Sequence, residues 1–368
     1  MQMVLRWKAL VVLAVCGLSG GPALRAAERP ERLLSPELLD QANLKVVWQQ
    51  ELPVKKGETF AALTILGNRL YVRSDRNYFW SLDRSKGDIV FSRSIAPEGI
   101  PVLGLASYGN RLITVVSNQL VELDEGLGTE RRVSDLELAI AAPPVRNSQF
   151  FYVSAADRRL HVLRAKDLVQ IFPVAASSDS LVTSVMADDS IVVFGTDGGN
   201  VVAMMPDTPK KLWQFDVPEA LAGPVVRDGN SFYFASVDTN VYRVDQTGVT
   251  TAKLIWKHQT EAVLNCGPLL TRDFVYQYAS GRGFTALAKA DGRVVWSLPE
   301  GLDLLAEAGN RAYVITKVGT LAVMDNARGR KLYWVNIAPV AGHATNTTDS
   351  RIYLADNTGR LVCLEPTL

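Results

Sequence analysis

Short apolar stretches alternate with polar turns along almost the whole chain, and this pattern predicts β-strands. Runs such as GNRLYV (67–72) and NSQFFYV (147–153) place alternating apolar residues between turn residues. Period-two runs bounded by Gly, Asn and Asp are typical of hairpin strands. Eight runs of this kind occur, at 67–72, 109–114, 147–153, 188–194, 229–234, 272–278, 309–314 and 349–354. We therefore expect the chain beyond the first strand at 46–52 to consist of strands and turns.

A second phrase recurs in step with these runs. In its clearest copy, SLDRSKGDIVF (81–91), Asp83 is followed by Gly87 four residues later and by Phe91 eight residues later. The slots equivalent to Asp83 lie 37 to 43 residues apart, at Asp124, Arg164, Met205, Asp245, Ala288, Asp325 and Glu365. A repeat of this length with several strands per unit predicts a β-propeller. The fold class is therefore all-β, with eight blades that stack because a lone hairpin is marginally stable in water.

Large aromatic residues close most copies of the phrase. They are Trp48, Phe91, Phe172, Trp213, Trp256, Trp296 and Trp334. Flat rings between adjacent sheets bury roughly 150–250 Å² each. We predict that these residues are structural and wedge neighbouring blades together, the alternative being that they stack on a cofactor.

The two ends of the repeat region predict how the ring closes. Residues 28–45 form an N-terminal extension, in which Ser35 and Pro36 favour the start of a short helix. The strand at 46–52 precedes the first full unit, whereas the last unit stops at 364–368 without a further aromatic strand. We expect the N-terminal strand to complete the eighth blade, so that the propeller spans 46–368.

Residues 1–27 have the pattern of an export signal. Arg6 and Lys8 precede an apolar run at 9–15, and small residues at 26–27 offer a cleavage point. This run is too short to cross a membrane as a helix, which needs about 20 apolar residues. Cys16 ends the segment LAVC, which resembles a bacterial lipobox, although Val15 is bulkier than the usual small residue. An exported protein is predicted, either soluble after cleavage or lipid-anchored through Cys16.

Charge argues against a nucleic-acid partner. The chain has 39 Lys+Arg and 38 Asp+Glu. Without residues 1–27 the counts are 36 and 38, and no basic stripe stands out. Proteins that bind nucleic acid usually carry a clustered basic surface. We expect protein or cell-envelope partners instead.

Residues with chemical potential are scattered over separate repeats. No metal-ligand spacing relates the three histidines, His161, His258 and His343, so no metal site is predicted. Cys266 and Cys363 lie in different apolar stretches, where they are either inert packing residues or, in an exported compartment, disulfide partners. The sequence identifies no catalytic residue.

The repeated phrase resembles that of the pyrroloquinoline-quinone (PQQ)-like propeller superfamily. The copy at 81–91 fits the pattern apolar-Leu-Asp-x-x-x-Gly-x-x-x-Trp well, and Asp325 with Gly329 and Trp334 fits nearly as well. The third unit departs most, with Arg164 in the Asp slot and Leu168 in the Gly slot. The resemblance covers 46–365 and implies a propeller, but one such fold hosts many unrelated activities.

Two branches of this superfamily imply different functions. The BamB type is an exported eight-bladed lipoprotein that acts as a scaffold in outer-membrane β-barrel assembly, and this chain is similar to it in length and layout. That likeness implies a non-enzymatic, cofactor-free scaffold in the periplasm or cell envelope, which binds envelope proteins through its loop faces. Quinoprotein dehydrogenases, the alternative, bind PQQ and Ca²⁺ on the propeller axis. That alternative implies a periplasmic oxidoreductase.

Overall fold

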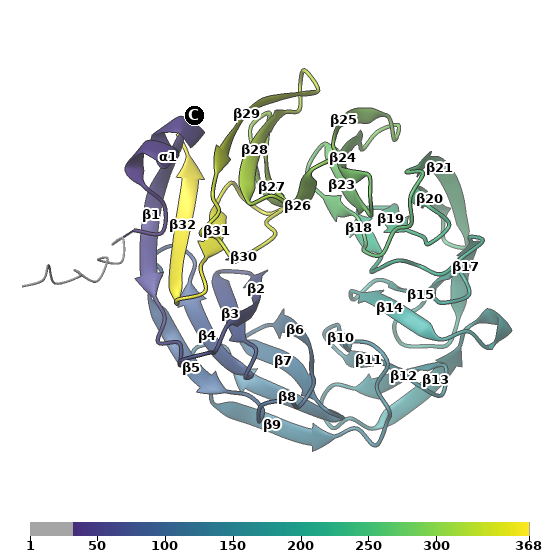
Figure 1. The fold of residues 1–368 in the computed structure, drawn as a ribbon. Coiled ribbons are helices and arrows are strands. Elements are labelled where there is room, and N and C mark those ends of the chain that lie inside the picture. The colour runs from purple at the N-terminus through teal and green to yellow at the C-terminus, as the bar shows by residue number, and fades with distance from the viewer. Residues whose placement is uncertain (1–31, 368) are drawn as a thin grey trace, which may run out of the picture. The chain divides into compact units, whose positions relative to one another are not determined.

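The computed structural model describes residues 32–367, and residues 33–367 form a ring of eight four-stranded antiparallel sheets (Figure 1). In seven sheets the four strands follow one another in the sequence, with the first strand at the centre of the ring and the fourth at its rim. The predicted eight-bladed β-propeller is therefore confirmed. Within residues 32–367 there is no helix long and apolar enough to span a bilayer.

The first four blades occupy one half of the ring. Blade 1 contains β2 (Phe60–Leu66), β3 (Arg69–Ser74), β4 (Tyr78–Asp83) and β5 (Ile89–Ser94). Blade 2 contains β6 (Val102–Tyr108), β7 (Arg111–Val116), β8 (Gln119–Asp124) and β9 (Glu130–Asp135). Blade 3 contains β10 (Val145–Arg146), β11 (Phe150–Ala155), β12 (Arg159–Arg164) and β13 (Gln170–Ala175). A short 3₁₀ turn (Ser177–Asp179) leads to blade 4, with β14 (Val182–Ala187), β15 (Val192–Thr196), β16 (Asn200–Met204) and β17 (Lys211–Asp216).

The other four blades complete the ring. Blade 5 contains β18 (Val226–Asp228), β19 (Ser231–Ala235), β20 (Asn240–Gly248) and β21 (Thr251–Gln259). Blade 6 contains β22 (Leu269–Leu270), β23 (Phe274–Ala279), β24 (Gly283–Ala288) and β25 (Val294–Leu298). Blade 7 contains β26 (Gly301–Ala308), β27 (Arg311–Thr316), β28 (Thr320–Asp325) and β29 (Arg330–Asn336). Blade 8 contains β30 (Gly342–His343), β31 (Ile352–Ala355), β32 (Arg360–Pro366) and β1 (Leu44–Glu51).

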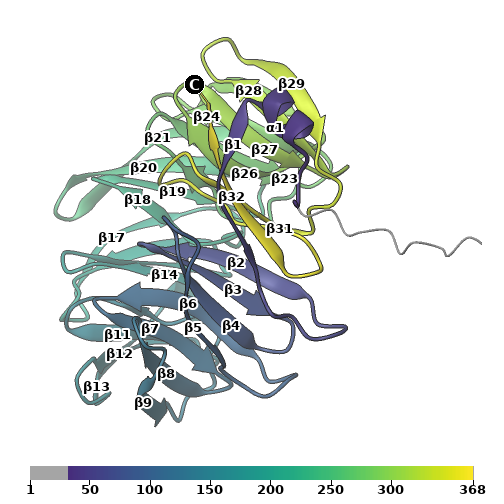
Figure 2. The ribbon, with the colours of Figure 1, turned by 90° about the vertical axis from the view of Figure 1, so that its left-hand side faces the viewer.

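The eighth blade closes the ring by combining strands from both ends of the repeat region. Strand β1 pairs antiparallel with β32, with Leu44 opposite Pro366 and Glu51 opposite Arg360 (Figure 2). The predicted closure by the N-terminal strand is confirmed. Helix α1 (Pro36–Ala42) precedes this strand, contacts β29 and is capped by the Ser35 hydroxyl, which accepts a hydrogen bond from the amide of Leu38 at 3.3 Å.

The recurring phrase builds the contact between one blade and the next. Asp83 accepts a hydrogen bond from the amide of Ser85 at 2.8 Å and so closes the turn between β4 and β5. Gly87 in this turn has a φ of +80°, and a Cβ there would lie 2.6 Å from the ring of Trp48 on blade 8. The Trp48 indole nitrogen donates to the carbonyl of Arg84 at 2.9 Å. Glycine is needed because the neighbouring aromatic ring takes the space of a side chain.

Most of the aromatic residues singled out by the sequence lie at such contacts. Trp48, Phe91, Trp213, Trp256 and Trp296 are buried, and Phe172 is partly buried. Trp256 repeats the arrangement of Trp48, because its indole donates to the carbonyl of Lys289 at 3.1 Å and its ring covers Gly292.

Trp334 differs from the other six, because 61% of its surface is exposed. On the next blade, the turn that should cover Trp334 would join β32 to β1, but these paired strands lie at opposite ends of the sequence and no turn links them. Glu365 of β32 occupies the Asp slot there. Helix α1 stands nearby instead, and its Ala42 carbonyl accepts a hydrogen bond from Tyr333 at 2.9 Å. The expectation of a wedged ring does not hold for Trp334.

Candidate functional site

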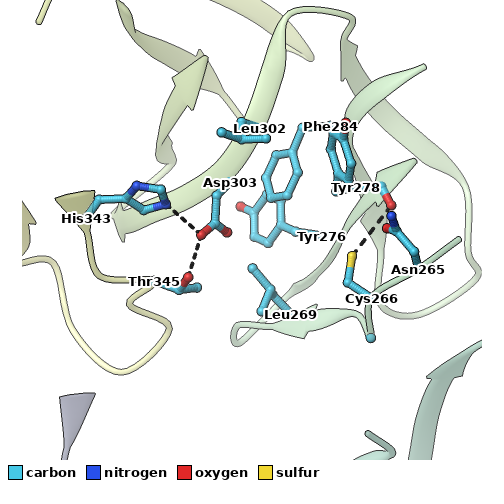
Figure 3. Close-up of a pocket in the computed structure, with 11 residues that line it drawn as sticks. Asn265, Cys266, Leu269, Tyr276, Tyr278, Phe284, Leu302, Asp303, His343 and Thr345 are labelled. Carbon is cyan, nitrogen blue, oxygen red and sulfur yellow. Dashed lines mark hydrogen bonds and ion pairs between the residues drawn. The ribbon is translucent and has the colours of Figure 1, made fainter. Parts of the chain in front are cut away.

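A pocket of about 380 Å³ lies close to the ring axis, between blades 6 and 7, and reaches blade 8 (Figure 3). Its wall is largely apolar, with few polar groups. The lining residues are Asn265, Cys266, Gly267, Leu269, Tyr276, Tyr278, Phe284, Leu302, Asp303, His343 and Thr345. Concave sites with an apolar wall and a few polar groups are the usual form of binding sites in proteins.

The innermost strands of three consecutive blades position these side chains. Leu269 lies on β22, Leu302 and Asp303 on β26, and His343 on β30. The second strand of blade 6, β23, adds Tyr276 to the wall. Because successive residues of a strand point to opposite sides, only alternate positions of β23 reach the pocket. Residues far apart in the sequence therefore meet at one point of the axial surface.

Asp303 is the polar centre of the pocket. Its Oδ2 lies 3.0 Å from Nε2 of His343 and accepts a hydrogen bond from the Thr345 hydroxyl at 2.5 Å, as Figure 3 shows. Its Oδ1 accepts the backbone amide of Leu304 at 2.8 Å. Three contacts hold the carboxylate in one orientation, so its position at the pocket wall is well defined.

Ring stacking and hydrogen bonds of Tyr276 hold the apolar wall of the pocket in place. The rings of Tyr276 and Phe284 stack with centroids 5.9 Å apart and an interplanar angle of 4°. The Tyr276 hydroxyl donates to Glu307 on blade 7 at 2.6 Å and accepts from Asn326 at 2.8 Å. Burial raises the pKa of Tyr276 well above its ordinary value, and the charge of Glu307 raises it further. The phenol therefore stays neutral and ties blade 6 to blade 7.

Neither cysteine of the described chain is an activated nucleophile. Burial raises the pKa of the Cys266 thiol, and the negative charge of Asp303 raises it further. Burial also raises the pKa of Cys363 to about 12. Protonated thiols react slowly, because the thiolate is the nucleophile. Both cysteines are free, so the disulfide that the sequence left open is not formed in this structure.

The three histidines lie far apart, as their sequence positions suggested. His161 contacts Asp157 and Gln170 on blade 3, the half-buried His258 lies on β21, and only His343 reaches the axial pocket. Across residues 32–367, no cluster of three or more His, Cys, Asp or Glu residues is placed to hold a metal ion.

A PQQ and calcium site does not fit the residues of this pocket. Ca²⁺ takes six to eight oxygen ligands, including carboxylates and amide oxygens. The pocket offers one carboxylate, Asp303, which His343 and Thr345 already engage, and one amide, Asn265, which lies on the opposite wall (Figure 3). The arrangement instead suits an apolar group with a hydrogen-bond donor that reaches Asp303.

Sequence reasoning missed every residue of this pocket except His343 and Cys266, and it assigned neither to a site. One local signal was available, since Asp303 interrupts the apolar innermost strand GLDLLAEA of blade 7. The aromatic residues Tyr276, Tyr278 and Phe284 resemble ordinary strand residues in the sequence. The lipidation candidate Cys16 and the export signal at 1–27 lie outside the described residues.

Comparison with known proteins agrees with the propeller fold. A family model described as "Outer membrane protein assembly factor BamB" matches residues 92–298 and 197–330. A search of the curated proteins found no match. The crystal structure of BamB from Moraxella catarrhalis superposes with a TM-score of 0.67 at 16% identity, covering 88% of this chain and 97% of that one. The computationally designed Ika8 protein gives 0.66 at 17% identity, covering 86% and 98%. At these identities the structural matches show the fold alone.

Proposed function

Because the chain belongs to the family of the outer membrane protein assembly factor BamB, we propose that it is an exported, non-enzymatic scaffold for envelope proteins. The family match is the single observation that carries this proposal. It spans blades 2 to 7, and the axial pocket is built largely from blades 6 and 7. The scaffold would act in the periplasm or cell envelope, with residues 1–27 as its export signal.

The axial pocket is the proposed docking point for a partner protein. Its walls are apolar, and Asp303 presents a fixed carboxylate that can accept a hydrogen bond or pair with a cation. An extended segment that places a large apolar side chain beside a Lys, Arg or hydroxyl group has the matching chemistry. Buried apolar anchors beside a defined polar contact are typical of the strongest positions in protein interfaces.

The chemistry of the pocket supports binding rather than catalysis. The pKa of Cys266 is raised, so the one thiol in the wall is a poor nucleophile at neutral pH. Oδ2 of Asp303 is already engaged by Thr345 and His343. These contacts fix a surface without activating a reacting atom.

A site-specific cross-link tests the docking proposal. A photoreactive amino acid replaces Leu302 in the full-length protein in its native host, and the cross-linked products are identified by mass spectrometry. We expect an envelope protein to be captured and the capture to be abolished by Asp303→Ala. A matched probe at Val318, an exposed hairpin residue of the same blade, should not capture it. Equal capture from both positions would contradict the docking site.

Two further measurements address the remaining alternatives. Incorporation of labelled fatty acid that is lost in Cys16→Ala would establish a lipid anchor at Cys16, and the absence of label in the parent protein would rule one out. Purified protein mixed with PQQ and Ca²⁺ is expected to show neither a stoichiometric chromophore nor dye-linked dehydrogenase activity. A calcium-dependent chromophore with that activity would replace the scaffold proposal by the oxidoreductase.

A further inference from the structure

The contact between blades 2 and 3 departs from the aromatic pattern of the other blades. In blade 2 the slot eight residues after Asp124 holds Arg132 on β9 instead of an aromatic residue. Its Nη1 donates to the carbonyl of Lys166 in the next blade at 3.1 Å. At the junction between blades 8 and 1, the corresponding hydrogen bond runs from the indole of Trp48 to the carbonyl of Arg84. The charged side chain keeps the contact between blades and brings a cation into the interior.

A single buried carboxylate compensates part of this charge. Glu122 on β8 has a side chain with 0% exposure. Its Oε1 pairs with Nη2 of Arg132, and its Oε2 accepts from Nη1 of Arg111 at 2.5 Å. A buried carboxylate needs such partners, because an unpaired buried charge is strongly unfavourable. One acid therefore serves two arginines.

A third arginine beside Arg111 and Arg132 makes no ion pair with a carboxylate within the part of the chain that the structure describes. Arg146 at the end of β10 lies over the rings of Tyr108 and Phe151, with the guanidinium carbon 4.3 and 5.0 Å from the ring centroids. Its Nε donates to the Asn147 carbonyl at 3.1 Å, whereas its buried Nη1 has no hydrogen-bond partner among the described residues. Burial lowers the pKa of Arg146, whereas the negative charge of Glu122 acts to raise it; the charges of Arg111 and Arg132 add to the lowering.

Arg146 lines a cavity of about 500 Å³ between blades 2 and 3 that is rich in positive charge. The other lining residues are Arg111, Ser148, Gln149, Phe150, Arg164, Ala165 and Lys166. Four of the eight lining residues are cationic and none is acidic. Three carboxylates contact lining residues from outside the wall: Glu122 pairs with Arg111 at 2.5 Å, Asp167 pairs with Arg164 at 3.0 Å, and Asp189 accepts from the amide of Ser148 at 2.8 Å. The cavity keeps an excess of positive charge, because Arg146 and Lys166 have no ion pair within residues 32–367.

We propose that this cavity binds an oxyanion, either a phosphate or a carboxylate group, through Arg146 and Arg164. A guanidinium presents two parallel N–H groups that match the oxygens of such anions. The aromatic rings under Arg146 hold its plane in place, so little side-chain freedom is lost on binding. The cavity lies beside the β10–β11 and β12–β13 turns. In an antiparallel blade these two turns lie at one face of the ring, whereas the loop that leads into the first strand lies at the other face. The axial pocket lies at that other face, beside the loop that leads into β22. The cavity between blades 2 and 3 is therefore independent of the proposed docking point.

Calorimetric titration of the full chain with inorganic phosphate at low ionic strength tests this site. We expect saturable binding, weakened at least about tenfold by Arg146→Gln or by Arg164→Gln, because a charge-assisted pair is lost in each variant. Arg164 is exposed, so its variant keeps the fold even if Arg146→Gln does not. Arg328→Gln is the matched control, since Arg328 is an exposed arginine that pairs with the turn residue Asp325 of blade 7.

A vesicle arm separates the two sources of a phosphate group. The protein is floated with vesicles of phosphatidylglycerol and of phosphatidylcholine, with citrate as the soluble carboxylate probe. Flotation with phosphatidylglycerol that Arg146→Gln abolishes assigns the site to lipid headgroups, whereas binding of free phosphate or citrate alone assigns it to a soluble anion. The proposal is overturned if no probe binds, or if Arg328→Gln weakens binding as much as Arg146→Gln and Arg164→Gln do.

Discussion

The junction between blades 8 and 1 and the junction between blades 2 and 3 use the same slots of the repeat for different chemistry. At the first, Trp48 lies over Gly87 and donates its indole hydrogen to the next blade. At the second, Arg132 stands in place of the aromatic ring and donates a hydrogen bond to the carbonyl of Lys166 on the next blade. Leu168 occupies the position that corresponds to Gly87, and it also adopts a positive φ, +61°. A donor that reaches the neighbouring turn is common to both junctions, whereas the apolar ring is not.

The difference has an energetic consequence. The aromatic junction gains free energy by removing a large ring from water. The charged junction places Glu122 in the interior, and the cost of dehydrating its charge offsets much of its attraction to Arg111 and Arg132. We conclude that the first junction mainly stabilises the ring, while the second gives up stability and presents charge to the cavity beside it.

Of the substitutions that test this comparison, Trp48→Ala should cause the largest loss of stability. It removes a buried ring and its hydrogen bond to Arg84, so we expect a loss of about 3–5 kcal/mol in the free energy of unfolding. Urea denaturation followed by circular dichroism measures it. Trp334→Ala is the control, because Trp334 is exposed, and should change stability by less than about 0.5 kcal/mol. Equal losses in both variants would mean that burial of the ring does not distinguish the junctions.

The close approach of Trp48 to the glycine turn can be tested next. Gly87→Ala should cost about 2–4 kcal/mol, because the new methyl group meets the ring while the backbone stays left-handed. Gly67→Ala is matched in backbone conformation, with a φ of +52°, but a Cβ there meets no atom within 4 Å. It should cost only about 1–2 kcal/mol. Thermal unfolding of both variants would show whether the ring or the backbone sets the requirement for glycine.

At the charged junction, Glu122→Gln leaves Arg111 and Arg132 without their shared anion. We expect a loss of about 2 kcal/mol, below the usual cost of breaking a buried pair because both arginines retain contact with solvent. Glu130, also on blade 2, forms an exposed pair with Arg93 of blade 1, and Glu130→Gln should lie within about 0.5 kcal/mol of the parent protein. A Glu122→Gln variant as stable as the parent would show that the carboxylate is not required to compensate the arginines.

The smallest predicted effect concerns acid stability at the aromatic junction. The hydroxyl of Ser85 holds the pKa of Asp83 below the ordinary value of an aspartate, so the charged form of Asp83 stabilises the folded state above that value. This contribution, below about 1 kcal/mol, is lost as the pH falls through the folded pKa. Asp83→Asn should therefore flatten the dependence of unfolding free energy on pH between about 5 and 3.

Ser85→Ala should reproduce part of this flattening, since it removes the main cause of the lowered pKa. The equivalent slot of blade 3 holds Arg164, which has no carboxyl group to titrate in this range. An unchanged pH dependence in Asp83→Asn would show that the turn carboxylate contributes nothing to acid stability.

The repeat predicted the blades and their closure because every unit carries the same alternation and the same turn. Alternation indicates which side chains are buried between sheets, but it does not show which partner a buried hydroxyl finds on the next blade. Tyr71 donates to Glu125 of blade 2 at 3.1 Å, and Tyr276 donates to Glu307 of blade 7 in the same way. The sequence treats both tyrosines as ordinary strand residues.

The candidate sites escaped sequence analysis for a related reason. Asp303 and His343 lie on different blades and meet because the ring brings their inner strands together. Arg132 was visible as a departure from the aromatic slot, but its compensation by Glu122 depends on packing across β8 and β9. Local patterns encode the repeated elements, whereas the sites depend on contacts between units.

The pairing of β1 with β32 means that the ring can close only late in synthesis. Synthesis proceeds from the amino end, so β1 emerges long before the strand that Leu44 and Glu51 must meet. Until then, its backbone donors and acceptors form a free edge able to pair with another chain. Nascent molecules should thus be most prone to aggregate before β32 emerges, and a chaperone that covers residues 44–51 would protect them.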